Sequence, residues 1–125
     1  IILDIDPFNK VILTRAGDAY RNMGQYEKAE EYYHKALNIE FDTYAILGLA
    51  MINKEKGNLE DAVESLQALM KNDPRNHRLY IEAAECFLLM NHKDKAIETL
   101  NQFQRTGLRN SQVSNLLDRL LNFES

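Results

Sequence analysis

Apolar residues recur along most of the chain at spacings of three and four residues, which is the pattern of one buried face of an α-helix. Short polar stretches separate these segments, and alternation typical of a half-buried strand is absent from them. The pattern predicts helices over Lys10–Asn22, Tyr26–Ile39, Thr43–Lys56, Leu59–Asn72, His77–Met90, Lys93–Thr106 and Ser111–Phe123. The sequence therefore predicts an all-α protein.

The predicted helices form a repeating pair. Three apolar positions with an internal spacing of four and three recur twice, at offsets of 33 and 34 residues; these sets are Ala29, Tyr33 and Ala36, then Ala62, Leu66 and Leu69, then Ala96, Leu100 and Phe103. Residues that favour helix N-caps recur in phase with them, at Asn9, Asp42, Asn76 and Asn110. Residues that tolerate a left-handed backbone recur at the turn within each pair, at Gly24, Gly57 and Asn91. Self-similarity at this period indicates a helical repeat array.

The first pair resembles the tetratricopeptide repeat, a helix–turn–helix module of 34 residues. It carries Gly17, Tyr20, Gly24, Tyr26, Ala29, Tyr33, Ala36 and Leu37 at the places typical of that family. The second pair keeps Ala50, Gly57, Ala62, Leu66 and Pro74, and the third keeps Tyr80, Ala84, Phe87, Ala96, Leu100 and Phe103. The resemblance implies a right-handed α-solenoid of about three repeats with a C-terminal capping helix.

We expect repeats at residues 9–42, 43–76 and 77–110, followed by a capping helix at residues 111–125. Asp118 stands where the repeats have a small residue, and a buried Asp there would be costly, so no further helix is expected to cover that side. The alternative is a truncated fourth repeat. Residues 1–8 align with the end of a second helix, which predicts the remnant of a preceding repeat and a longer parent protein.

The resemblance also implies that the first helix of each repeat lines an inner surface, on which a peptide or a partner helix would bind. Helical periodicity places these candidate residues there: Thr14, Asp18, Arg21, Tyr44, Leu47, Met51, Lys54, Arg78, Ile81, Glu85 and Leu88. The apolar members are surplus to the core positions already assigned, which favours an apolar binding groove. The alternative is that they fill gaps between neighbouring repeats.

Charge in this groove is mixed. Arg15, Arg21, Lys54 and Arg78 favour an acidic ligand, whereas Asp18, Glu55 and Glu85 lie among them. The alternative is that these mixed charges form ordinary solvated surface. One subfamily of these repeats holds the C-terminal carboxylate of chaperones with basic and amide side chains. The matching places here are Thr14, Asp18, Gly48, Arg78 and Glu82. Because Asp18 and Glu82 would repel a carboxylate, binding of that kind is not expected.

Other classes of function find little support in the sequence. The net charge of −4 offers no basic face for nucleic acid, and no apolar run is long enough for a transmembrane helix. His34, His77 and His92 fall in different repeats and not at metal-ligand spacing, and Cys86 has apolar neighbours typical of a buried thiol. No phosphate-binding loop or nucleophile motif is present. We therefore expect neither an enzyme nor a cofactor, and the compartment stays open.

The sequence thus predicts a scaffold that binds a protein or peptide. The alternative is a structural module that self-associates through its N-terminal end, because Ile1, Ile2, Leu3 and Ile5 would belong to an incomplete repeat.

Overall fold

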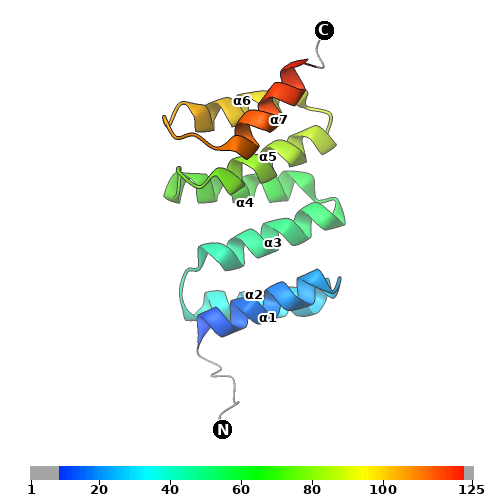
Figure 1. Ribbon diagram of the computed structural model, residues 1–125. Helices are drawn as coiled ribbons and strands as arrows, with labels where there is room; N and C mark the ends of the chain where they lie inside the picture. The colour runs from blue at the N-terminus through cyan, green and yellow to red at the C-terminus, as the bar shows by residue number, and fades with distance from the viewer. Residues whose placement is uncertain (1–8, 123–125) are drawn as a thin grey trace. The chain divides into compact units, whose positions relative to one another are not determined.

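The computed structural model describes residues 9–122, and within that range all regular structure is α-helical (Figure 1). The helices are α1 (Lys10–Asn22), α2 (Tyr26–Ile39), α3 (Thr43–Lys56), α4 (Leu59–Asn72), α5 (His77–Leu89), α6 (Lys93–Gln104) and α7 (Ser111–Asn122). Two ends differ from the prediction: α5 stops one residue earlier, at Leu89, and α6 stops at Gln104 instead of Thr106. The expected remnant repeat at residues 1–8 and the predicted helix end at Phe123 lie outside the described residues.

The early end of α6 has a local cause. Arg105 is its C-cap, and the Thr106 hydroxyl donates a hydrogen bond to the Phe103 carbonyl at 2.6 Å. Gly107 then adopts a positive φ of 84°, which ends helical geometry. A side chain that bonds the backbone in this way competes with the helical hydrogen-bond ladder.

All four predicted N-caps are confirmed. The Asn9 side chain accepts hydrogen bonds from the backbone N–H groups of Val11 and Ile12. The side chains of the other three caps accept from the backbone N–H two or three residues ahead, in the pairs Asp42 with Tyr44, Asn76 with Arg78, and Asn110 with Val113. Each bond satisfies a donor that the first helical turn leaves free, so these residues fix where the helices begin.

The predicted turns are confirmed as well. Gly24, Gly57 and Asn91 have φ values of 79°, 86° and 63°, in the left-handed region that ends a helix. Asparagine is among the few side chains that adopt this conformation readily, which explains how Asn91 replaces glycine in the third repeat.

The chain divides into two compact units, Ile1–Lys56 with α1 to α3 and Gly57–Ser125 with α4 to α7, and we describe each by itself. The boundary falls in the turn within the predicted second repeat.

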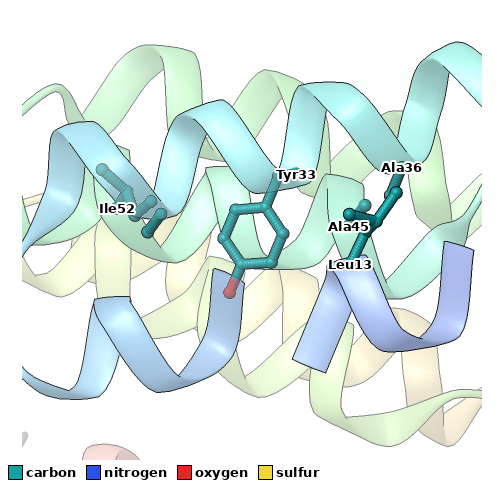
Figure 2. Packing of buried hydrophobic residues seen from close by; sticks show 6 residues of the cluster. Leu13, Tyr33, Ala36, Ala45 and Ile52 are labelled. Carbon is teal, nitrogen blue, oxygen red and sulfur yellow. The ribbon is translucent and has the colours of Figure 1, made fainter. Parts of the chain in front are cut away.

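The core of the first unit is built around Tyr33 of α2, whose ring extends toward α1 (Figure 2). Leu13, Ala36, Ala45 and Ile52 are buried with it. A Cβ atom added at Gly17 of α1 would lie 2.7 Å from two ring carbons of Tyr33, and one added at Gly48 of α3 would overlap the ring. These two glycines therefore make room for the aromatic ring.

The second unit packs α5 against both α4 and α6. Buried apolar side chains face one another across these helices, among them Leu66, Leu69, Leu79, Cys86, Leu100 and Phe103. The Phe103 ring makes edge contacts with the rings of Tyr80 and His77. Burial of Cys86 agrees with the prediction from its neighbours.

α7 closes the C-terminal end of the second unit against α5 and α6. Val113, Leu116 and Leu117 are buried, whereas Asp118 is exposed. This is the arrangement expected of a capping helix, and the fold is all-helical with about three repeats and a cap.

Candidate functional site

Three of the predicted binding residues meet at one hollow of the first unit. The hollow measures about 400 Å³ and lies at α1 and the start of α3. Its walls contain Lys10, Val11, Thr14, Arg15, Asp18, Asp42 and Tyr44. Two apolar side chains at this hollow are exposed, Val11 at 50% and Tyr44 at 69% of their surface. The family resemblance together with helical spacing placed Thr14, Asp18 and Tyr44 on one surface in the prediction, and all three line the same hollow in the folded chain.

Thr14 has a structural partner inside this hollow. Its hydroxyl is buried and donates a hydrogen bond of 2.7 Å to Oδ2 of Asp42. The other carboxylate oxygen of Asp42 accepts from the Tyr44 backbone N–H at 3.0 Å. One carboxylate therefore caps α3 and ties α3 to α1, a second role that the capping pattern in the sequence did not reveal.

Asp18 and Arg21 are held by Tyr33 of α2. The Tyr33 hydroxyl donates a short hydrogen bond to Oδ1 of Asp18, and Nε of Arg21 donates to the same hydroxyl oxygen at 3.1 Å. A second guanidinium nitrogen of Arg21 lies 3.6 Å from Asp18. Burial and the hydrogen bond to Asp18 raise the pKa of Tyr33 to about 12. The tyrosine is thus a neutral donor at physiological pH.

Leu47 and Met51 differ from the sequence interpretation. Both are buried, with exposed fractions of 4% and 9%, so they are not surplus to the interior as the sequence argument assumed. The sequence from Tyr44 to Ile52 contains only apolar residues and glycine, so α3 is apolar on every side. A helix with that property is typically buried all round, and this signal could have placed both side chains in the core.

The remaining candidates fall at other places. Lys54, on α3, is partly buried, as are Ile81, Glu85 and Leu88 on α5. Nε of Arg78 lies 3.9 Å from a carboxylate oxygen of Glu82 one turn further along α5. A hollow of about 540 Å³ in the second unit is lined by other residues, from α4, the end of α5 and α6. The four candidates on α5 are therefore not brought together at that hollow.

Other chemistry finds no site in the part of the chain that the structure describes. Residues 9–122 contain no group of three or more His, Cys, Asp or Glu side chains that could hold a metal ion. Among the described helices, none combines the length and apolar character needed to cross a membrane.

Comparison with known families identifies the class of protein. Two models described as tetratricopeptide repeat match residues 11–41 and 54–120, the second covering more than half of the chain. The chain therefore belongs to the tetratricopeptide repeat family, a class of protein-binding modules whose fold is typically non-enzymatic.

Solved structures with the same fold include proteins from bacteria and yeast. PcrH from Pseudomonas aeruginosa is 19% identical with a TM-score of 0.78, and the match covers 96% of each chain. The type III secretion chaperone SycD of Yersinia enterocolitica, in complex with a peptide of the translocator YopD, is 21% identical with a TM-score of 0.76, over 90% of this chain and 92% of SycD.

The Hsp90 co-chaperone Cns1 of Saccharomyces cerevisiae is 18% identical with a TM-score of 0.79, over 98% of this chain and 42% of Cns1. No curated protein sequence was found to be significantly similar.

Proposed function

We propose that this chain binds a segment of a partner protein, as an extended peptide or a helix, on the first helices of its repeats. The hollow at α1 and α3 serves as the anchor point. One observation carries the proposal: Val11 and Tyr44 expose apolar surface beside a hollow of about 400 Å³. Exposed apolar side chains at a concave site are a common mark of a binding surface.

Likeness of fold adds support, because SycD was solved with a peptide of the translocator YopD. At this low sequence identity the likeness supports a shared fold but does not indicate the ligand. The partner of this chain therefore has to be found experimentally. Burying one large side chain of the ligand in such a hollow is worth about 1.5–3 kcal/mol. Part of this gain is lost when the peptide becomes ordered, so a single anchor gives modest affinity.

The test uses peptides selected from a random displayed library on the purified 125-residue chain. Selected peptides are then titrated calorimetrically into the parent chain, into the Tyr44→Ala variant and into the control variant His34→Ala, which changes an exposed residue of α2. Because Tyr44 is exposed, its truncation should leave the fold intact, which circular dichroism can verify. Leu47 and Met51 are unsuitable for this purpose, since replacing buried side chains alters the fold itself.

We expect Tyr44→Ala to weaken binding about tenfold, which corresponds to about 1.4 kcal/mol, and His34→Ala to leave it unchanged. Failure to enrich any peptide would contradict the proposal. So would enriched peptides that bind Tyr44→Ala as tightly as the parent chain.

A further inference from the structure

The structure shows which cations of the predicted binding surface already have a partner within the chain. Of its four cations, Arg21 is bound to Tyr33 and Asp18. Arg78 pairs with Glu82, and Lys54 also has an interaction within the folded chain. Arg15 is exposed and makes no hydrogen bond or ion pair with any residue in the range 9–122. Of these four cations, Arg15 is therefore the one whose charge has no partner among residues 9–122.

The other polar groups of the hollow are already engaged. Lys10 lies 3.4 Å from a carboxylate oxygen of Glu40 and donates to the Phe41 carbonyl. Both carboxylate oxygens of Asp42 accept hydrogen bonds, and Asp18 is bound by the Tyr33 hydroxyl. What remains for a ligand is the apolar surface of Val11 and Tyr44 together with the guanidinium of Arg15. The Asp42 carboxylate keeps its negative charge, because both of its hydrogen bonds come from neutral donors.

Val11 and Arg15 are close enough to be contacted by adjacent ligand residues, and Tyr44 lines the same hollow. Arg15 follows Val11 by four positions on α1, and residues with that spacing are neighbours on a helix surface, with about 5–6 Å between Cβ atoms. An extended peptide advances about 3.3 Å per residue, so this separation corresponds to one or two residues of ligand. A guanidinium recognises a carboxylate in a planar, bidentate geometry.

We propose that the segment bound at this hollow carries an acidic side chain one or two residues from an apolar anchor, and that Arg15 binds its carboxylate. The proposal rests on the proposed function and specifies the chemistry of the partner. The net charge of the chain is −4, which disfavours acidic ligands in general. Preference for an acidic ligand residue would therefore be a local property of Arg15.

The experiment repeats the library selection on the parent chain, on Arg15→Glu, on Arg15→Lys and on the control Arg109→Gln, which removes an exposed arginine of the second unit. Peptides from the parent chain should be enriched in Asp or Glu one or two positions from an aliphatic or aromatic residue. Selection on Arg15→Glu should enrich Lys or Arg at that position instead. Arg15→Lys should keep the acidic preference, since it retains the charge.

Affinity gives a second measurement. A peptide selected on the parent chain should bind Arg15→Gln about fivefold more weakly, the loss expected for one solvent-exposed ion pair, and Arg109→Gln should bind it like the parent chain. Raising the salt concentration should weaken binding to the parent chain more than binding to Arg15→Gln.

The outcomes separate this inference from the proposed function. If selected peptides depend on Tyr44 but show no acidic preference, and bind Arg15→Gln like the parent chain, the role of Arg15 is wrong and the binding site stands. If no peptide is enriched, or none depends on Tyr44, the binding site itself is wrong and the role of Arg15 is overturned with it.

Discussion

Replacing Gly48 with alanine tests whether the ring of Tyr33 determines the packing of the first unit. The added methyl carbon would overlap Cζ of the ring and lie 2.5 Å from the hydroxyl oxygen. The hydroxyl also holds Asp18 and Arg21, so a displaced ring would disturb both of these hydrogen bonds. In a second variant, Tyr33→Leu removes the obstacle; leucine stands at the equivalent positions, Leu66 and Leu100, of the other two repeats.

Two effects of opposite sign decide the magnitude. Overpacking a well-filled core costs about 1–3 kcal/mol, and weakening two hydrogen bonds adds about 1 kcal/mol for each bond lost. Alanine is favoured over glycine inside a helix by about 1 kcal/mol, which opposes these losses. Gly48→Ala should therefore destabilise the protein by about 2–4 kcal/mol. In the Tyr33→Leu background, only the helix preference remains, and the same substitution should be neutral or stabilising by up to about 1 kcal/mol.

The measurement is a double-mutant cycle by urea denaturation, followed by circular dichroism at constant pH. The expected coupling between the two positions is about 3 kcal/mol. Gly17→Ala provides a matched second cycle, because its added methyl carbon would meet the same ring at 2.7 Å. Equal destabilisation by Gly48→Ala in both backgrounds would show that the clash with Tyr33 is not the cause, and would refute the reasoning.

Two further predictions follow from the polar contacts of the first unit. Asp42→Ala should lower the free energy of unfolding by about 1–2 kcal/mol, because it removes the cap of α3 and the partner of Thr14; Asp42→Asn should retain most of that stability in the same urea titration, and an equal loss in both variants would contradict a capping role. The pKa of Tyr33 is raised to about 12 from its usual value of about 10, so the unfolded chain releases this proton at a lower pH than the folded chain does. The contribution of Tyr33 to stability is therefore complete below about pH 10 and is lost as the pH rises toward 12. The stability difference between the parent chain and Tyr33→Phe should therefore shrink across that interval, and a difference independent of pH would contradict the assignment.

The sequence predicted the fold well because each local signal agreed with the others. The spacing of small and apolar residues, the caps at Asn9, Asp42, Asn76 and Asn110, and the left-handed turns all recur with one period. When independent local signals agree in this way, the sequence specifies one structure. Four of the seven predicted helices have the observed bounds, and the predicted end of the last one, Phe123, lies outside the described residues. The errors at α5 and α6 fall at C-terminal ends, and at α6 a side-chain bond to the backbone decides the last turn.

The binding surface was less predictable because helical periodicity predicts the side of a helix on which a side chain lies but not whether that side chain is buried. It places Leu47, Met51 and Tyr44 on one side of α3, yet two of these side chains are buried and one is exposed. Charge pairing was equally hidden. The sequence shows that Asp18, Arg21 and Arg15 lie on one helix, but it does not show that Tyr33 reaches two of them from α2 and leaves the third available.

The hydrogen bonds from Tyr33 to Asp18 and Arg21 make the first repeat different from the other two, so the repeats are not fully interchangeable. Arrays of this kind are usually regarded as strings of equivalent modules, in which one unit can be duplicated or substituted for another. Leu66 and Leu100 have no hydroxyl, and the small residues at the positions equivalent to Gly17 are Ala50 and Ala84. A copy of either later repeat placed first would keep the caps and turns, but it would replace Asp18, Arg21 and Tyr33 together and lose the hydrogen bonds that join them. The first repeat therefore differs from the other two, because a side chain of α2 determines which charges α1 leaves exposed.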